Sequence, residues 1–490
     1  MRHAIRWCSA LAGLMLAAVA WGGVWGGAAP ERWTGSVELP GGMKLEFTVA
    51  LEEAAGTISI PMQGVKDLAL SDVTGRGPTI RFTLKPAGAP EAAHAKFSWD
   101  VAEDGTSKGG LLRQMGQEFT VTAKRLAAGE AAPEMRRPQE PKPPFPYRSE
   151  EVEVKVGESH VLSGTLTVPE GKGPFPGVIL VSGSGPQDRD EALLGHKPFL
   201  VLADHLTRSG VAVLRYDDRG VGKSTGNFAT ATSDDFGVDA LAALEFLSRR
   251  PEIDAGKVGI VGHSEGGLIA PMVAATSDLP KFIVLLAGPG MRGLELLVLQ
   301  GRLITEASGA DADTAARSAA ASERVLRAVV DGKTDDAVRR LLREAVEAEL
   351  AMNAATKDKP AEERAAMAEQ TAQQQAASVL SPWMKRFLAI DPAESLRKVR
   401  VPVLAMIGEK DLQVPPKENL EAIRAALSAG GNTKVTLKEM AGLNHLFQTA
   451  KTGAPGEYVE IEETFAPAAL EAVSGWIREV TGSGGAAEKK

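Results

Sequence analysis

Cysteine is almost absent from the chain, because Cys8 is the only one among 490 residues. Cys8 lies in an apolar N-terminal stretch that we expect to be removed on export, so the mature protein would contain no thiol. That absence excludes a cysteine nucleophile, a disulfide framework and a thiolate metal site. Hydroxyl, imidazole and carboxyl groups are left as candidates for chemistry.

An excess of positive charge is missing as well. The formal net charge is −8, with 55 Lys and Arg against 63 Asp and Glu, and no long basic run occurs. A nucleic-acid or anionic-membrane partner would favour a basic patch, so the sequence argues against both. The hydrophobic share of 44% is typical of a globular protein with a large core. At this length we expect two or three domains.

The first 29 residues have the pattern of a secretory signal peptide. Arg2 and Arg6 supply a positive start, WCSALAGLMLAAVA follows as an apolar core, and small residues at 18–20 suit cleavage. Residues 1–29 therefore predict export to the periplasm or the medium, with no membrane span after cleavage. A permanent membrane anchor is the alternative, which the short, glycine-broken run disfavours.

Residues 31–126 are predicted to form a β-rich accessory domain. Short runs of β-branched and apolar residues, such as GTISIP and PTIRFTLK, are bounded by turn-forming residues, which is typical of a small sandwich or barrel. No His, Asp and Ser gather there into a recognisable site. Residues 127–149 are rich in proline and charge and predict a semi-rigid linker.

From residue 150 onwards, apolar strand-like runs alternate with helix-like segments. GVILVSGS, VAVLRYDD and KVGIVGHS each precede a helical stretch, and VPVLAMIGEKD follows much later. This alternation predicts an α/β fold, a mostly parallel sheet flanked by helices, built from residues 150–290 and 396–482. Residues 483–490 are expected to form a flexible tail.

Residues 291–395 interrupt the alternation with Ala, Glu, Arg and Leu at helical spacing, as in DAVRRLLREAVEAEL. We expect a helical cap inserted between two core strands; a solvated helical spacer is the alternative. Trp383 and Phe387 lie near the return to the core. They could line a pocket or simply pack, and packing is the preferred interpretation.

Ser264 is the candidate nucleophile. It stands in GHSEG, residues 262–266, a Gly-x-Ser-x-Gly motif between an apolar strand-like run and an apolar helix-like run. A nucleophile elbow needs this context, because its sharp turn has room only for small neighbours and lifts the serine above the sheet. The N–H of Glu265, at the helix N-terminus, would face a developing oxyanion. A plain tight turn is the alternative.

His445 is the candidate base, because it is the only one of seven histidines that follows Ser264 and the chain order of this motif is nucleophile, acid, base. His263 is a poor base, since adjacent residues on the elbow point different ways. Asp411, in a turn after VPVLAMIG, is the candidate acid that would hold the tautomer of His445. Glu409 is the alternative acid. A structural histidine and a turn-forming aspartate are the plainer interpretations.

The loop SGSGPQDRD, residues 182–190, is expected to supply the second oxyanion donor, because its glycines let backbone N–H groups approach a ligand. We assign this donor to the Ser184 amide, with the Gly183 amide as the alternative. Four charged residues are expected to form ion pairs that brace the neighbouring loops: Arg189, Asp190, Asp218 and Arg219.

Two other glycine-rich stretches fail the motifs they approach. GPGMRG, residues 288–293, contains a proline and leads into the cap, without the second strand ending in an acid that a dinucleotide site needs. GVGKST, residues 220–225, has Asp217 where a phosphate loop needs its first glycine. No metal-ligand cluster stands out, so we expect neither a metal nor a cofactor.

With these phrases the sequence resembles the α/β-hydrolase superfamily and, more narrowly, secreted bacterial carboxylesterases of the EstD type. The similarity rests on SGSGPQDRDE, YDDRGVGKSTG, GHSEGG, PWMKRFLAIDP, GEKDLQV and GLNHLFQ and extends over about 150–482. The resemblance implies an α/β-hydrolase fold and hydrolysis of carboxylic esters with short acyl chains. It implies Ser264 as nucleophile, Asp411 as acid and His445 as base. The β-rich domain lies outside the pattern.

The sequence therefore predicts an exported serine esterase that acts on a small-molecule ester. A serine aminopeptidase or other amidase is the first alternative, because the same triad serves amides; an acidic pair in the cap that binds a substrate amine would favour it. The second alternative is a non-catalytic envelope binding protein that uses the β-rich domain. The complete set of Ser264, Asp411 and His445 disfavours that alternative.

Overall fold

The computed structural model describes most of the chain after the predicted signal peptide. The described residues are 30–38, 44–60, 65–85, 91, 94–114, 117–127, 129–131, 136–352 and 356–483. The predicted signal peptide, residues 1–29, and all but the first residue of the predicted tail lie outside these ranges. Of the described helices, none is both long enough and apolar enough to cross a membrane.

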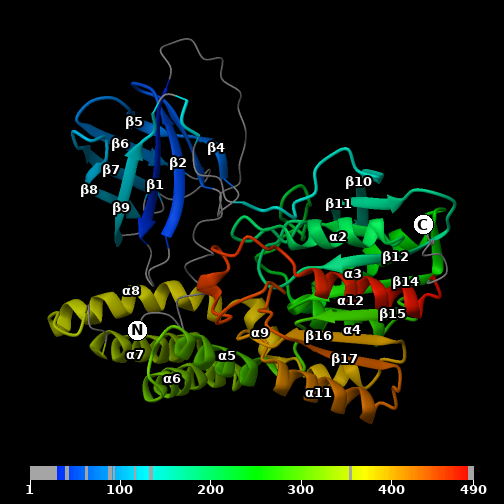
Figure 1. Cartoon of the computed structure of the whole chain (residues 1–490). Coiled ribbons are helices and arrows are strands. Elements are labelled where there is room, and N and C mark those ends of the chain that lie inside the picture. The colour runs from blue at the N-terminus through cyan, green and yellow to red at the C-terminus, as the bar shows by residue number, and fades with distance from the viewer. Residues whose placement is uncertain are drawn as a thin grey trace.

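The N-terminal region is an antiparallel sheet with the strand order β4-β3-β2-β1-β9-β8-β7-β6-β5 (Figure 1). Its two edge strands are joined by a single residue, so the sheet curls around its core and the two edges approach each other. The strands are β1 (Glu31–Glu38), β2 (Lys44–Leu51), β3 (Gly56–Ile60), β4 (Val65–Ala69), β5 (Ser71–Thr74), β6 (Thr79–Leu84), β7 (Ala95–Val101), β8 (Ser107–Gln114) and β9 (Gln117–Arg125).

Aromatic side chains fill the centre of this N-terminal sheet. Trp33 meets Trp99 edge to face with ring centroids 5.5 Å apart, and Phe82 stacks on Phe97 at 4.8 Å. Both tryptophans are fully buried. Alternation of inward apolar and outward polar residues along the strands, as in β2, produces this one-sided core. All nine strands fall inside the range predicted to be β-rich.

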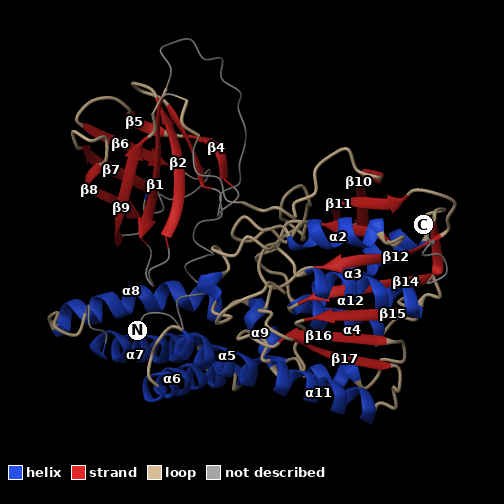
Figure 2. Ribbon diagram, viewed as in Figure 1, coloured by secondary structure: helices blue, strands red, loops and turns tan. Residues whose placement is uncertain are grey.

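The C-terminal region is built on an eight-stranded, mostly parallel sheet with the order β10-β11-β13-β12-β14-β15-β16-β17 (Figure 2). Only β10, β11 and β13 pair antiparallel; the other pairs are parallel. The central strands are buried on both faces, which is why their sequences are continuously apolar. The strands are β10 (Tyr147–Val156), β11 (His160–Pro169), β12 (Phe175–Val181), β13 (Ala212–Tyr216), β14 (Ile253–His263), β15 (Phe282–Leu286), β16 (Val403–Gly408) and β17 (Val435–Met440).

Helices cover both faces of this sheet, as predicted. One hydrophobic cluster contains side chains of α3, α4, α10 and α11, and a second contains side chains of α2 and α12 on the opposite face. These helices are α2 (Pro198–Arg208), α3 (Ser233–Ser248), α4 (Glu265–Ala274), α10 (Pro392–Leu396), α11 (Pro416–Ala429) and α12 (Pro467–Val480), with a short 3₁₀ turn, η4 (Pro455–Glu457).

Six described helices lie between β15 and β16; α10 packs on the sheet, and the other five form the insertion where the cap was predicted. These five are α5 (Gly293–Ala307), α6 (Ala312–Val330), α7 (Asp335–Met352), α8 (Ala361–Val379) and α9 (Pro382–Ala389). The arrowheads of the parallel strands point toward this insertion and toward the N-terminal sheet, so both lie at the carboxyl-end edge of the parallel sheet (Figure 2). Ligand sites of α/β sheets form at this edge.

The predicted linker is more firmly held than its composition suggests. The last described part of the linker begins at Arg136, and β10 begins at Tyr147. Between them, the Arg137 guanidinium donates to the backbone carbonyls of Leu194 at 2.9 Å and Val459 at 3.1 Å. Hydrogen bonds to distant backbone groups fix this segment on the C-terminal region, which a proline-rich composition alone does not reveal.

Candidate active site

Ser264 occupies a strained turn between β14 and α4. Its φ and ψ are 52° and −115°, a conformation that non-glycine residues seldom adopt and that marks functional sites. The turn is possible because its neighbours lack side chains: a Cβ at Gly262 would lie 2.0 Å from Gly266 O, and one at Gly266 would lie 2.0 Å from Val181 O. The predicted elbow geometry is thus present, with Ser264 at the head of α4.

His445 and Asp411 meet at the same edge of the sheet. Asp411 follows β16, His445 follows β17, and His445 Nδ1 donates to Asp411 Oδ2 at 2.8 Å. The other carboxylate oxygen accepts the backbone N–H groups of Gln413 and Val414, each at 2.8 Å. Both side chains of the pair are buried. The pair therefore fixes the orientation of the imidazole and leaves Nε2 as its outward nitrogen.

The alternative acid, Glu409, has a different partner. Its Oε2 accepts the backbone N–H of Gly442 at 2.7 Å, so it braces the start of the loop between β17 and α12, residues 441–466. We call this segment the base loop because it carries His445. The structure thus brings together His445 and Asp411, not His445 and Glu409.

Ser264 and His445 form no direct hydrogen bond, but the residue before Ser264 contacts His445. The ring of His263, the residue before Ser264, lies 4.9 Å from the His445 ring, and His263 Nε2 donates to the His445 carbonyl at 3.0 Å. Among the described residues, no hydrogen bond is formed by Ser264 Oγ or His445 Nε2. Catalytic hydrogen bonds of ligand-free enzymes are often long and tighten when substrate binds.

The loop between β12 and α2, residues 182–197, lies against the elbow and is called the oxyanion loop below. A Cβ at Gly183 would lie 3.2 Å from Ser264 Cβ. The Gly183 N–H already donates to Glu191 Oε1 at 2.7 Å, so the alternative oxyanion donor is engaged. Within the described chain, the amides of Ser184 and Glu265 have no protein acceptor, and their assignment as oxyanion donors stays a prediction.

The Glu265 side chain is a feature that the motif did not predict. Its Oε1 accepts Ser233 Oγ at 2.6 Å and Trp383 Nε1 at 2.7 Å. Burial raises the pKa of the Glu265 carboxyl, and the hydroxyls of Ser233 and Ser184 and the Trp383 N–H act against that rise. This carboxyl thus joins the nucleophile helix to α3, to the oxyanion loop and to α9 at the end of the cap.

Trp383 does more than pack. Its ring stacks on Phe387 with centroids 5.2 Å apart, as the preferred interpretation has it, but its N–H also holds Glu265 beside the nucleophile. A sequence shows the aromatic residue and not its polar partner, which is 118 positions away.

Three of the four expected bracing residues form ion pairs, and one does not. Arg189 pairs with Asp217 at 2.9 Å, Arg215 pairs with Asp190, and Arg219 pairs with Asp239 at 2.7 Å. The prediction for Asp218 is wrong: among the described contacts it has no cationic partner and accepts Ser182 Oγ and the Gln187 N–H instead. Burial raises the pKa of Asp218, because it penalises the ionised carboxylate.

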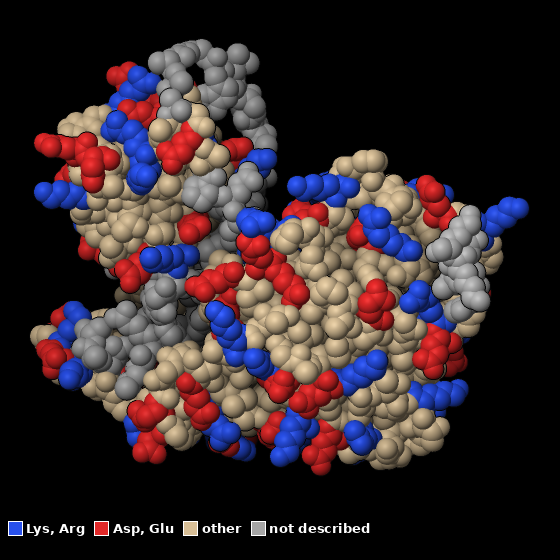
Figure 3. All heavy atoms as spheres, in the orientation of Figure 1, with Lys and Arg blue, Asp and Glu red and all other residues tan. Residues whose placement is uncertain are grey.

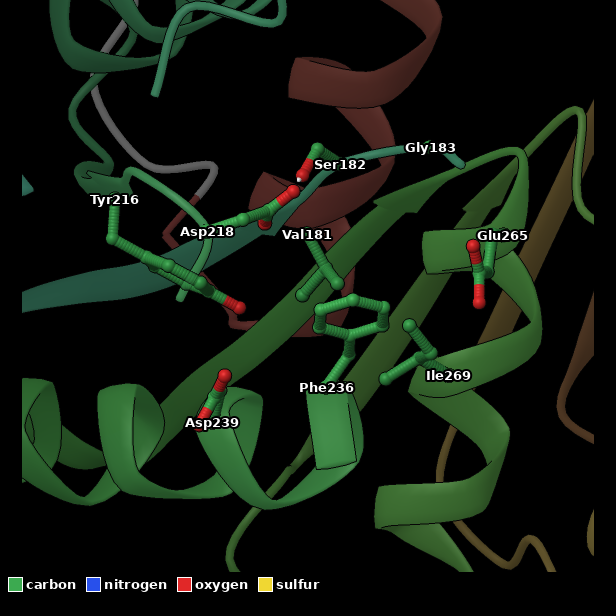
Figure 4. A pocket seen from close by; sticks show the side chains of 9 residues that line it. All are labelled: Val181, Ser182, Gly183, Tyr216, Asp218, Phe236, Asp239, Glu265 and Ile269. Atoms are coloured by element: carbon green, nitrogen blue, oxygen red, sulfur yellow. Dashed lines mark hydrogen bonds between the residues drawn. The ribbon is translucent and has the colours of Figure 1, made fainter. Parts of the chain in front are cut away.

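A small pocket lies between the start of the oxyanion loop, α3 and α4 (Figure 4). Its lining includes three carboxyl groups, those of Asp218, Asp239 and Glu265, together with Tyr216 and apolar side chains. Each carboxyl already accepts hydrogen bonds from neighbouring protein groups. The acids therefore connect the elements around the pocket.

Comparison with known proteins assigns the chain to a family. Residues 197–449 match the family described as "Serine aminopeptidase, S33". The chain belongs to this family. It is an α/β hydrolase that resembles esterase EstD of Thermotoga maritima, with 35% identity over 134 residues. That match covers 27% of this chain and 32% of EstD, so the chain matches about a third of its relative's length. The predicted superfamily and fold class are confirmed.

Solved structures of similar shape include two from other organisms. An esterase of Pyrococcus furiosus, Pf2001, has a TM-score of 0.41 and 16% identity, and covers 68% of this chain and 91% of its own. A hypothetical protein of Pseudomonas aeruginosa has a TM-score of 0.42 and 14% identity, and covers 71% and 98%. At these scores the two likenesses add no weight to the assignment.

Proposed function

We propose that this α/β hydrolase is a serine esterase that cleaves carboxylic esters through an acyl-enzyme intermediate. Ser264 is the nucleophile, His445 the general base and Asp411 the residue that holds the tautomer of His445. The amides of Glu265 and Ser184 stabilise the oxyanion. No step of this reaction needs a metal or a cofactor.

The reaction follows the usual two halves of serine hydrolysis. Ser264 Oγ attacks the ester carbonyl carbon while His445 Nε2 takes its proton, and the carbonyl electrons move onto the oxygen. The tetrahedral intermediate collapses, and the imidazolium gives the proton to the departing alcohol. Water then attacks the acyl-enzyme with His445 again as base, which releases the acid and restores Ser264.

The observation that carries this proposal is the buried pair of His445 Nδ1 and Asp411 Oδ2 at 2.8 Å, next to the strained Ser264. Asp411 accepts hydrogen bonds from three donors, and the one from His445 Nδ1–H holds the tautomer in which Nε2 carries no proton. A neutral imidazole in this tautomer is the form that can act as a base.

The substrate class and location are also proposals. Esters, preferably with short acyl chains, are favoured by the resemblance to EstD-type carboxylesterases and by the name of the Thermotoga relative. Positive and negative side chains are interspersed over the face seen in Figure 3, which suits an uncharged small molecule better than a polyanion. Export rests on residues 1–29 of the sequence alone.

Amide hydrolysis is the second candidate, and the description of the family favours it. The feature that would support it is an unpaired carboxylate placed to bind a substrate amine. The carboxyls near the elbow are engaged: Asp239 by His160 and Arg219, and Glu265 by Ser233 and Trp383. The described site therefore favours the ester over the aminoacyl substrate.

The test is to assay p-nitrophenyl esters from acetate to palmitate in parallel with aminoacyl p-nitroanilides, using the mature protein and Ser264→Ala. We expect hydrolysis of the short esters, at least about 10⁴-fold less in the variant, and little cleavage of the anilides. Cleavage of the anilides alone would replace the esterase proposal with the amidase. Equal ester hydrolysis by both proteins would remove Ser264 from the mechanism.

A further inference from the structure

The side chain of His263 links two loops of the candidate site. His263 is the residue before Ser264 and is only 6% exposed. Its Nδ1 lies 2.8 Å from Glu191 Oε1, in the oxyanion loop, and its Nε2 lies 3.0 Å from the backbone carbonyl oxygen of His445, in the base loop. One imidazole therefore contacts both loops that flank the nucleophile.

Both neighbours of this imidazole are hydrogen-bond acceptors. A backbone carbonyl can only accept, and Glu191 Oε1 already accepts the N–H of Gly183 at 2.7 Å. A neutral imidazole has one donor nitrogen and one acceptor nitrogen, so it can satisfy one of these partners. An imidazolium satisfies both, and the Glu191 carboxylate neutralises its charge.

We propose that His263 is a protonated positioning residue that locks the oxyanion loop to the base loop across the nucleophile elbow. The inference rests on the proposed function, because it assigns these loops their catalytic roles. The chain of contacts runs from the Gly183 amide through Glu191 and His263 to the His445 carbonyl. It fixes the residue before the proposed oxyanion donor relative to the base.

The charges around His263 agree with this protonation state. Burial alone lowers the pKa of His263, but Glu191, the His445 carbonyl and the more distant Asp411 together outweigh it and raise the pKa above the ordinary 6.5. The raised pKa favours the charged form, and the group loses its proton as the pH rises through that raised pKa. Both hydrogen bonds of His263 are therefore present below about pH 6.5, and one of them is lost as the pH rises through the raised pKa.

The first experiment detects the proton directly and does not need activity. Side-chain ¹⁵N–¹H spectra of the full protein at neutral pH are compared with those of His263→Gln, which assigns the signals that disappear. We expect one imidazole with protons on both nitrogens. A single protonated nitrogen on His263 would place the proton on Glu191 and overturn the proposal.

The second experiment measures kcat and KM for a short ester from pH 6 to pH 10. We expect His263→Gln to lower kcat about 100-fold with KM little changed, since misplacing a catalytic group by about 1 Å costs that much. The alkaline fall of the wild-type profile should vanish in the variant. Glu191→Gln should lower kcat in the same direction.

His205→Gln is the matched control. His205 Nε2 contacts Ser474 Oγ at 2.9 Å, between α2 and α12 and outside the two loops. We expect its kcat and pH profile to equal those of the wild type. The same alkaline fall in His263→Gln as in the wild type would contradict the lock, and inactivity of the wild type itself would count against the esterase proposal instead.

A separate observation concerns the N-terminal sheet. Its hydrophobic core does not end with its own strands, because the same cluster of buried side chains contains Leu194, Leu446 and Tyr458. Leu194 belongs to the oxyanion loop, and Leu446 and Tyr458 belong to the base loop. Tyr458 also accepts a hydrogen bond from Gln413, two residues after Asp411.

The segment that enters β10 is fastened to the same two loops. Gln139 accepts the backbone N–H groups of Thr464 and Phe465 at 2.6 and 3.0 Å and donates to the Phe465 carbonyl at 2.7 Å. Arg137 donates to carbonyls of both loops. We infer that the N-terminal sheet is a structural part of the active site, holding the oxyanion and base loops from outside.

Cutting the chain in its folded state tests this inference. A specific protease site replaces residues 132–135 of the full-length protein, and the cleaved protein is passed over a sizing column. We expect the two pieces to stay together with kcat/KM within about twofold of the uncut protein. Pieces that separate while the hydrolase piece keeps full activity would overturn the inference.

Leu194→Asp in the cleavable protein sharpens the test by placing a carboxylate in the shared cluster. We expect the cut pieces to separate and kcat to fall at least about tenfold. Val238→Asp is the control, because Val238 is 57% exposed on α3 and should tolerate the charge. Full activity of the separated Leu194→Asp piece would again show that the sheet is dispensable for catalysis.

Discussion

The two sheets of this protein both have apolar cores, and they differ in which strand ends meet at each edge. In the antiparallel N-terminal sheet, neighbouring strands run in opposite directions, so neither end collects the same ends of all strands. In the parallel sheet, β14, β16 and β17 end at the same edge, with β15 between β14 and β16, and Ser264, Asp411 and His445 lie in the turns and loops that follow these strands. Strand direction therefore decides which sheet can assemble a site from distant residues.

The largest expected effect comes from the residue that follows β16. Asp411→Asn should lower kcat about 10⁴-fold, because an amide cannot hold the base tautomer of His445. The measurement is the steady-state rate on a short p-nitrophenyl ester. Glu409→Gln changes the neighbouring carboxyl, which accepts the Gly442 N–H, and its rate should stay within about threefold of the wild type. Equal losses in both variants would contradict the pairing.

The next largest effect is expected from adding a methyl group at a crowded glycine in each sheet. A Cβ at Gly262 would meet Gly266 O at 2.0 Å, and one at Gly35 in β1 would meet Thr122 O at 2.5 Å. Gly262→Ala should lower kcat about 100-fold by displacing Ser264. Gly35→Ala should lower the melting temperature and leave most of kcat. The reverse result, a loss of kcat in Gly35→Ala and only a lower melting temperature in Gly262→Ala, would contradict the different roles assigned to the two sheets.

Trp383→Phe is expected to lower kcat for the ester by a few fold. The variant keeps the ring that stacks on Phe387 and removes the N–H that donates to Glu265 Oε1, while the Ser233 hydroxyl still donates to that oxygen. Loss of one hydrogen bond to a charged group costs about 1.5–3 kcal/mol, and the part that reaches catalysis is the displacement of the elbow. Ester kinetics with the melting temperature measured alongside separate the two contributions.

The smallest effect is a pH dependence of stability. The raised pKa of Glu265 means that the folded protein binds this proton more tightly than the unfolded chain, so the carboxyl weakens folding as the pH rises above its ordinary 4.5. Glu265→Gln keeps an oxygen acceptor and removes that dependence. In urea titrations, the free energy of unfolding of the variant minus that of the wild type should increase as the pH rises from 4 to 7. A constant difference would contradict the raised pKa.

Local sequence patterns predicted the features that depend on chain direction. The glycines of GHSEG and the position of Ser264 after a buried strand specify the elbow, and Asp411 and His445 each follow a strand of the same sheet. The contact between Asp411 and His445 therefore follows from topology once the parallel order is known.

Contacts between distant loops could not be predicted in the same way. Glu191 meets His263 across 72 positions, and Trp383 meets Glu265 across 118. Nothing in the local pattern of either partner indicates the other. Asp218 illustrates the same point. We predicted an ion pair from its charge, but in the structure it is buried and accepts hydrogen bonds from a hydroxyl and a backbone amide. Such contacts depend on how loops pack after the sheet has formed.

The most direct test of the account is active-site labelling with a fluorophosphonate, followed by peptide mass spectrometry. The account predicts one modified residue, Ser264, a labelling rate strongly reduced by Asp411→Asn, and no labelling of Ser264→Ala. Modification of another residue, or an unchanged rate in Asp411→Asn, would contradict a nucleophile at Ser264 that is activated through His445 and Asp411.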